Sequence, residues 1–172
     1  MDLSKMIRDI PDFPIKGILF KDITTLTRDP EAFAQAVEEM LTPFADKEID
    51  LVVAIESRGF IFGAPIALRL GAGFVPVRKE GKLPAATIKA EYSLEYGSNV
   101  LEIHKDAIHQ GQRVLIIDDL LATGGTAKAT VELVEALGGV VVGATFLIDL
   151  AFLHGTDKLE GYETFSVIQF EK

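Results

Sequence analysis

The sequence predicts a single domain of the α/β class, with a central, mostly parallel sheet flanked by helices. Three runs rich in β-branched apolar residues predict its strands: 49–55, 113–118 and 140–148. These runs are continuously apolar rather than alternating, which is typical of strands covered on both faces. Helical patterns lie between them, and alternation of strands with helices favours a parallel sheet. The chain has 172 residues, about the length of one domain.

The helical patterns have recognisable starts and stops. The first covers residues 31–44, with Asp29 placed to cap it and Pro30 at its first position, where a missing N–H costs no helical hydrogen bond. Two more patterns, 59–70 and 126–137, follow predicted strands directly, and the second runs into a pair of glycines. Paired glycines favour a helix end. The start signal before residue 31 and the stop signal after residue 137 therefore both support the predicted helices.

Two stretches do not follow this alternation. Residues 1–28 are predicted to form a cap laid on the sheet, within one domain that spans 1–172. Residues 78–97 are polar, basic at their start and without a sustained helical period, which predicts a long mobile loop or an irregular β-excursion. Loops of that length in compact domains tend to be functional.

Composition and charge exclude several classes of function. The chain carries 17 Lys and Arg against 26 Asp and Glu, a net charge of −9, which disfavours a nucleic-acid partner or an anionic membrane surface. Cysteine is absent, which excludes disulfides, thiolate catalysis and Cys-ligated metals and indicates a cytoplasmic protein. The N-terminus does not resemble a signal peptide. The most apolar segment, 140–153, is shorter than the roughly 20 residues that cross a bilayer.

The most informative motif begins at the end of the strand predicted at 113–118. Two adjacent acids, Asp118 and Asp119, precede a turn over residues 122–126 that contains paired glycines and two threonines and opens a helix. Glycines let several backbone N–H groups converge, and the helix N-terminus adds partial positive charge, so this turn predicts a phosphate cradle. The acids, which repel phosphate, predict a grip for a sugar diol. The alternative is a solvated strand exit and an ordinary turn.

Other phosphate motifs are missing. The chain contains no Gly-x-x-x-x-Gly-Lys-Ser/Thr and no Gly-x-Gly-x-x-Gly, which argues against an ATPase loop and a dinucleotide-binding fold. The acid pair with Ala-Thr-Gly-Gly-Thr instead resembles the phosphoribosyl-pyrophosphate (PRPP) signature of the type I phosphoribosyltransferases. Segments 13–23, 56–60 and 78–84 with 92–97 resemble the N-terminal hood, pyrophosphate loop and flexible loop of the adenine-specific members of that family. The likeness runs in order over nearly the whole chain.

This resemblance implies a type I phosphoribosyltransferase fold with a hood at 1–28 and a flexible loop at 78–97. It implies transfer of the 5-phosphoribosyl group from PRPP to adenine, giving AMP and pyrophosphate in purine salvage. The ribose hydroxyls would lie on Asp118 and Asp119. The 5′-phosphate would lie on Ala122, Thr123, Gly124, Gly125 and Thr126. The pyrophosphate would lie on Glu56, Ser57, Arg58, Arg78, Lys82 and Tyr96, with a strained or cis peptide at Glu56–Ser57.

The resemblance also implies the base site and the catalytic residues. Adenine would lie among Leu19, Phe20, Lys21 and Leu150, with Phe20 stacking on the base and the backbone of Lys21 reading its edge. The catalytic candidates are Arg58 and Glu95, the latter for proton handling. From the sequence alone, a Glu in a polar loop is usually solvated and a Phe between apolar neighbours is usually core.

Chemistry supports these roles. Displacing pyrophosphate from C1 of ribose develops positive charge on the sugar, so nearby acids and ordered phosphates must stabilise it. A closing loop would exclude water. Mg²⁺ is expected to arrive with PRPP, because no protein cluster would hold it alone, and the resemblance implies a homodimer. Two alternatives remain: transfer to another base, and a PRPP-sensing regulator of nucleic acid, which the charge disfavours.

Overall fold

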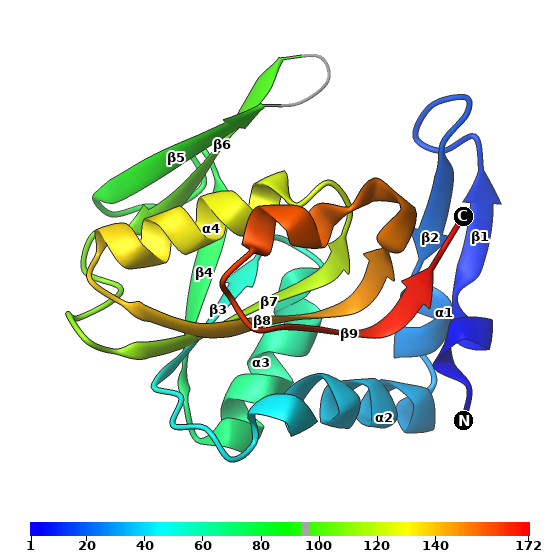
Figure 1. Ribbon diagram of the computed structural model, residues 1–172, viewed down its shortest axis with the longest axis horizontal. Helices are drawn as coiled ribbons and strands as arrows, with labels where there is room; N and C mark the ends of the chain where they lie inside the picture. Colours follow the sequence, from blue (N-terminus) through cyan, green and yellow to red (C-terminus); the bar gives the residue numbers. More distant parts are fainter. Residues whose placement is uncertain (94–96) are drawn as a thin grey trace.

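The computed structural model describes residues 1–93 and 97–172 and contains a seven-stranded sheet in the order β5-β6-β4-β3-β7-β8-β9 (Figure 1). The parallel strands are β3 (Leu51–Ile55), β4 (Gly73–Lys79), β7 (Arg113–Leu121), β8 (Val140–Leu150) and β9 (Thr164–Phe170). The antiparallel strands at one edge are β5 (Thr87–Ser93) and β6 (Ser98–His104). The predicted α/β class with a mostly parallel sheet is confirmed.

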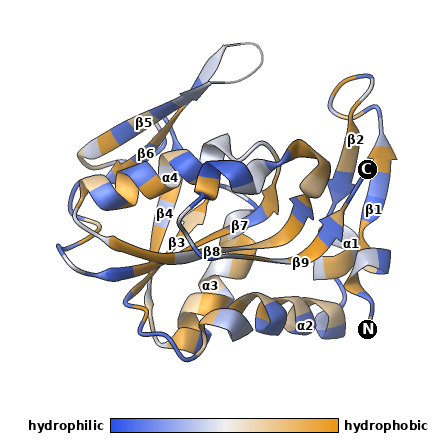
Figure 2. Ribbon diagram, in the orientation of Figure 1, coloured by the Kyte–Doolittle hydropathy of each residue, from blue (hydrophilic) through white to orange (hydrophobic). Residues whose placement is uncertain are grey.

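Helices cover both faces of this sheet. They are α2 (Pro30–Leu41) and α3 (Gly59–Leu70) on one face, and α4 (Gly125–Ala136) on the other (Figure 1). In β7, Leu115 and Ile117 pack into the core with α2 and α3, whereas Val114 and Ile116 pack into the core with α4. Successive side chains of a strand point to opposite faces, so a continuous apolar run fills two cores. Figure 2 shows this apolar colouring along the central strands.

The helix boundaries follow the local signals in the sequence. Asp29 caps α2 by accepting hydrogen bonds from the N–H groups of Glu31 and Ala32 at 3.0 and 2.9 Å. The helix ends at Leu41, and residues 42–44 form a 3-10 turn instead of continuing it. Helix α3 has the predicted bounds, and α4 begins one residue earlier than predicted.

Strand β7 is longer than predicted, and this corrects the position of the acid pair. The strand continues to Leu121, so Asp118, predicted as its last residue, and Asp119, predicted to follow it, both lie inside it. The reason is its neighbour: β8 extends to Leu150 and pairs with β7 as far as Leu121. The parallel ladder therefore holds the backbone of both acids rigidly at the carboxyl end of the sheet.

Most of the described residues within 78–97 belong to strands: β4 ends at Lys79 and β5 covers Thr87–Ser93, with a turn and an irregular connection over 80–86 between them. Strands β5 and β6 make an antiparallel hairpin in which Ile88 lies opposite Ile103 and Ala90 opposite Leu101. These side chains pack with the α4 core, which explains the alternation of apolar and polar residues along β5. Of the two predicted alternatives, the β-excursion is therefore found, but its strands are regular. Residues 94–96 lie outside the described part of the chain.

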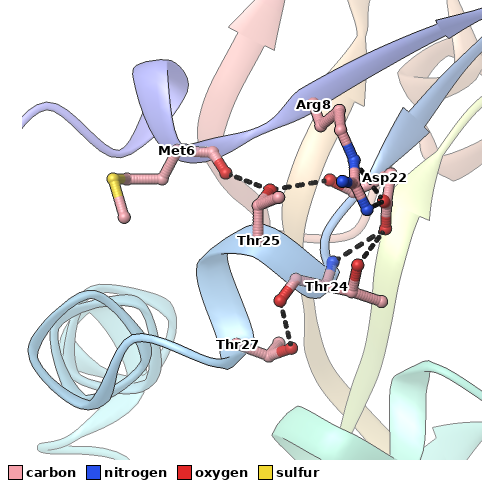
Figure 3. A network of polar contacts seen from close by, with 6 residues as sticks. All are labelled: Met6, Arg8, Asp22, Thr24, Thr25 and Thr27. Carbon is pink, nitrogen blue, oxygen red and sulfur yellow. Dashed lines mark hydrogen bonds and ion pairs between the residues drawn. The ribbon is translucent and has the colours of Figure 1, made fainter.

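The N-terminal segment forms a small two-stranded sheet of its own. It contains β1 (Arg8–Pro11) and β2 (Leu19–Asp22), which are antiparallel, followed by α1 (Thr24–Thr27). Asp22 accepts hydrogen bonds from the Thr24 backbone at 2.9 Å and from Arg8 at 2.6 Å, and the Thr25 hydroxyl donates to the carbonyl oxygen of Met6 (Figure 3). This network ties the root of the hood together. Over the described residues, no helix is long and apolar enough to span a membrane.

Candidate active site

A cleft of about 450 Å³ opens at the carboxyl ends of β3 and β7. Within the sheet, β3 lies between β4, the next strand along the chain, and β7, so successive strands are added on opposite sides of β3. Such a reversal of strand order is where open α/β sheets place their ligand sites. Four parts of the chain meet in the cleft: residues 55–58 at and after the end of β3, residues 118–124 with 126 and 127 at the end of β7 and the start of α4, Lys79 at the end of β4 with Lys82 beyond it, and Tyr92 with Leu101 from β5 and β6.

The turn between β7 and α4 forms one wall. Ala122, Thr123, Gly124 and Thr126, four of the five residues predicted to bind the 5′-phosphate, line the cleft. Gly124 has φ +85°, and a Cβ there would collide with the carbonyl oxygen of Gly155, so this position requires glycine. The N-terminus of the 12-residue helix α4 begins immediately behind the turn, where it favours an anion.

Gly125 differs from the rest of the predicted cradle. It is absent from the cleft walls and lines a neighbouring hollow together with Tyr92 and Lys158. A Cβ on Gly125 would lie 3.2 Å from the Tyr92 ring. Glycine at this position therefore serves the close approach of the β5–β6 hairpin to α4.

The acid pair forms the floor of the cleft. Asp118 and Asp119 are both buried, and the Asp119 N–H donates to the Asp118 carboxylate at 2.8 Å. Burial, followed by the charge of Asp119, raises the pKa of Asp118 well above its usual range, as expected for two close carboxyls in a dry site. A Cβ on Gly59 would lie 3.0 Å from the Asp118 carboxylate. The start of α3 can therefore pack directly against the acid pair.

Arg58 connects the two sides of the cleft. Its Nε donates to Asp119 at 2.7 Å, and its guanidinium carbon lies 5.3 Å from the centre of the Phe20 ring. Burial lowers the pKa of Arg58, but the charges of Asp119 and Asp118 outweigh this and raise it. The side chain is 47% exposed and can therefore contact a ligand while holding Asp119. The predicted cis peptide at Glu56–Ser57 is present.

Glu56 binds cations rather than facing the cleft as a free carboxylate. Its side chain, 6% exposed, accepts from the backbone N–H of Lys79 and from Lys82 Nζ at 2.6 Å, with Arg78 Nε 3.7 Å away. Burial raises the pKa of Glu56, but Lys82, Lys79 and Arg78 together lower it. A negative side chain so engaged organises the basic residues that were predicted to bind pyrophosphate. Arg78 itself is not part of the cleft wall.

The four residues predicted to frame the base do not line this cleft. Leu19 is exposed, Phe20 and Leu150 are half-buried, and only Phe20 approaches the cleft, through Arg58. The Lys21 side chain is buried and points elsewhere: its Nζ lies 2.7 Å from Asp9 and 3.9 Å from the centre of the Phe170 ring. Only the backbone of Lys21 is therefore left for a role in base recognition.

Two predicted site residues, Glu95 and Tyr96, lie outside the described residues. The cleft also contains side chains that the sequence reasoning did not assign, among them Lys79, Tyr92 and Leu101. Lys79, the last residue of β4, belongs to the basic run at the start of the predicted loop, and Tyr92 belongs to the segment that resembles the flexible loop. The sequence therefore contained a signal for both residues. Leu101 carried none, because its position depends on the pairing of β6 with β4 and β5.

Known proteins resemble this chain in sequence and in fold. Residues 25–169 match the model of the phosphoribosyl transferase domain family. The adenine phosphoribosyltransferase of Halothermothrix orenii is 57% identical over 169 residues, which cover 98% of this chain and 99% of that protein. The crystal structure of the enzyme of that name from Thermoanaerobacter pseudethanolicus is 58% identical, covers 98% of both chains and has a TM-score of 0.94. The Saccharomyces cerevisiae enzyme, solved with an imino-altritol bisphosphate and adenine, is 44% identical, covers 96% of both chains and has a TM-score of 0.90.

Proposed function

This chain belongs to the phosphoribosyltransferase family, and we infer that it transfers the 5-phosphoribosyl group from PRPP to adenine, giving AMP and pyrophosphate. One observation carries the inference: the cleft sets a pair of carboxylates between a glycine-rich helix start and a cluster of cations. PRPP presents the complementary groups in the same order, a 5′-phosphate, a diol and a pyrophosphate. The adenine-specific relatives match the chain over nearly its whole length.

We propose a role for each wall of the cleft. The 5′-phosphate lies on residues 122–126, where backbone N–H groups and threonine hydroxyls donate to it. Asp118 and Asp119 accept from the ribose hydroxyls. Ser57, Arg58 and Lys82, together with the undescribed Tyr96, hold the pyrophosphate. Glu56 and Arg78, the latter outside the cleft wall, support them through the ion pairs around Glu56.

The reaction that this arrangement supports is a displacement at C1 of ribose. The bond from C1 to pyrophosphate breaks with both electrons leaving on the pyrophosphate, and a purine nitrogen forms the new bond to C1. Arg58, beside the buried Asp119, stabilises the negative charge that develops on the departing group. The buried carboxylates oppose the positive charge that develops on the sugar. Glu95 is the proposed group for the proton of the purine.

Adenine is proposed to lie over the Phe20 ring, with Leu19, Leu150 and the backbone of Lys21 at its edges. The position of Phe20 beside Arg58 supports this, because it places an aromatic face at the mouth of the cleft. Phe20 is half-buried and Leu19 is exposed, unlike the side chains of the hydrophobic core. A flat apolar ligand would cover these side chains.

The donor set fits a Mg²⁺ ion that arrives bound to PRPP. Asp119 and Glu56 are already paired with Arg58 and Lys82, and the described residues contain no group of three ligating side chains. Asp118 and Asp119 would contact the ion indirectly, through its waters. When bound, the ion would neutralise charge on the pyrophosphate.

We also propose that the protein is a cytoplasmic homodimer. Ile61 and Leu68, one face of α3, are exposed, as is Phe74 on β4, which lies beside α3. Large apolar side chains gathered in one region of a surface favour an interface. The absence of cysteine fits a reducing compartment.

The decisive experiment is product analysis. The pure protein is incubated with PRPP, Mg²⁺ and, separately, adenine, hypoxanthine, guanine, xanthine or orotate, and the nucleotides are resolved by chromatography. AMP formed from adenine alone is the expected result. A different nucleotide would contradict the proposed base site, and bound PRPP without any product would favour the regulator.

A further inference from the structure

We propose that Glu102 is a positioning residue for the pyrophosphate side of the cleft: from the β5–β6 hairpin, its carboxylate holds the turn at Gly81 so that Lys82 reaches the ligand. The inference rests on the proposed function for the identity of that ligand. Glu102 itself is not part of the cleft wall. Its effect on the reaction must therefore pass through the residues that it holds.

The position of Glu102 suits this role. It lies in β6, opposite Arg78 of β4 on one side and Lys89 of β5 on the other, and only 7% of it is exposed. One carboxylate oxygen accepts from the N–H of Gly81 at 3.1 Å, and the other accepts from the Thr87 hydroxyl at 2.5 Å. The strand on which Glu102 lies is thus connected to the turn beyond β4.

Both hydrogen bonds favour the charged form of this carboxyl. The Thr87 hydroxyl and then the Gly81 N–H lower the pKa of Glu102, so the group is ionised at neutral pH. A hydrogen bond to an ionised acceptor is roughly twice as strong as one between neutral groups. The contact with Gly81 is therefore stronger than an ordinary turn contact.

Hydrogen bonds rather than packing hold the turn at Gly81. Besides the contact with Glu102, the Lys82 N–H donates to the carbonyl oxygen of Lys79 at 3.3 Å, and the Glu80 N–H donates to that of Val100 at 3.2 Å. Gly81 has φ +84°, and a Cβ built on it would meet nothing within 4 Å. One end of the turn is held by Glu56, which accepts from the N–H of Lys79. Its middle is held by Glu102. Together with the backbone hydrogen bonds, two carboxylates, Glu56 directly after β3 and Glu102 in β6, therefore hold the backbone that carries Lys82.

Lys82 is the residue whose freedom the turn controls. Its side chain is 46% exposed, lines the cleft and reaches Glu56 with Nζ at 2.6 Å. A lysine on an unrestrained turn loses much conformational entropy when it orders around a ligand, and ordering it beforehand improves affinity. Lys82 would contact pyrophosphate both before and during displacement. Loss of its positioning should therefore weaken PRPP binding without slowing the chemical step.

The test compares two variants of Glu102 by steady-state kinetics. Glu102→Ala removes the acceptor and should raise the KM for PRPP about tenfold, with kcat within about twofold and the KM for adenine unchanged. Glu102→Gln keeps an acceptor for the Gly81 N–H and should stay within about threefold of the original KM. Calorimetric Kd values for PRPP, taken without adenine, should follow the same order. This binding readout does not depend on AMP formation, so it separates failure of the inference from failure of the proposed function.

A double-mutant cycle distinguishes positioning of Lys82 from general weakening of the hairpin. In a Lys82→Ala background, Glu102→Ala should raise the KM for PRPP no further, because both changes remove the same contact. The matched control is Glu91→Ala, which removes another hairpin carboxylate that accepts from Ser98 and lies away from the turn. This control should leave the KM for PRPP unchanged.

Gly81→Ala provides a second route if Glu102→Ala does not fold. The site has room for the methyl group, but the left-handed backbone conformation disfavours it, so the KM for PRPP should again rise with kcat retained. The inference is wrong if Glu102→Ala leaves PRPP affinity unchanged. It is equally wrong if kcat alone falls, or if the effects of Glu102→Ala and Lys82→Ala add in full.

Discussion

The ion pair between Arg58 and Asp119 joins the two chemical halves of the cleft. The partners are 61 residues apart in the sequence and 2.7 Å apart in space. Asp119→Ala or Arg58→Ala should lower kcat/KM by at least about a hundredfold, because each change removes a charged group aimed at the reacting centre. Circular dichroism should show a folded protein in both cases. Asp106→Ala, which removes an exposed carboxylate outside the cleft, is the control and should retain full activity.

Asp118 is predicted to lower the stability of the fold while it contributes to PRPP binding. Its raised pKa means that the native state holds a proton that the unfolded chain has released, so stability falls as pH rises from about 4 through the raised pKa. Asp118→Asn removes this loss and keeps an acceptor for the N–H of Asp119. The variant should melt about 2–4 °C higher at pH 7, yet bind PRPP more weakly.

Thermal melts of both proteins between pH 4 and 8, with and without PRPP and Mg²⁺, check this prediction. The gap between the two melting temperatures should widen as pH rises. If the variant melts at a lower temperature than the original protein at pH 7, the prediction that ionised Asp118 destabilises the fold is wrong.

At the scale of elements, the hood depends on Asp22. The Thr24 hydroxyl and N–H, followed by Arg8, lower the pKa of Asp22 from 3.8 to about 2. The contribution of this group to stability is therefore present above about pH 4 and is lost as pH falls toward 2. Asp22→Ala should loosen β2 and raise the KM for adenine more than the KM for PRPP, since β2 carries Phe20.

Steady-state kinetics with each substrate varied in turn measure this difference. Asp46→Ala, which removes an exposed carboxylate far along the chain from the hood, should change neither KM. Equal increases in both KM values for Asp22→Ala would mean that the hood does not contact the base selectively.

Some helices and strands could be predicted from local sequence patterns and others could not. Strand β7 and helices α3 and α4 could be predicted because their apolar runs, caps and glycines act over a few residues. Strands β4 and β9 were not predicted. In β4, Pro76 lies between the two buried valines, and a proline argues against a central strand; β9 mixes polar with half-buried residues and has no clear period. The extent of β7 was underestimated because the length of its partner β8 decides how far the ladder continues.

For the whole molecule, the exposed apolar side chains near α3 predict the oligomeric state. Sedimentation should find a dimer, and Leu68→Glu should shift it toward a monomer, because a buried unpaired charge opposes association. Leu68 is 83% exposed in the single chain, so the change should not lower the stability of the monomer. The control is Leu153→Glu, which changes an exposed apolar residue in the turn after β8, away from α3 in the sequence. This variant should remain a dimer. A monomer from the unaltered protein would contradict the proposal.

By itself, the sequence determined the α/β class, and it predicted the glycine-rich turn over residues 122–126 and the acid pair as parts of one candidate site. These features depend on local chemistry: apolar runs make buried strands, and glycines before a helix make an anion site. Only the tertiary structure decided that Asp119 pairs with Arg58 and Glu56 with Lys82. It also turned the Lys21 side chain toward Phe170 and connected Glu102 to Gly81. These contacts join separate strands, and their geometry depends on the order and register of the sheet, which no local pattern encodes.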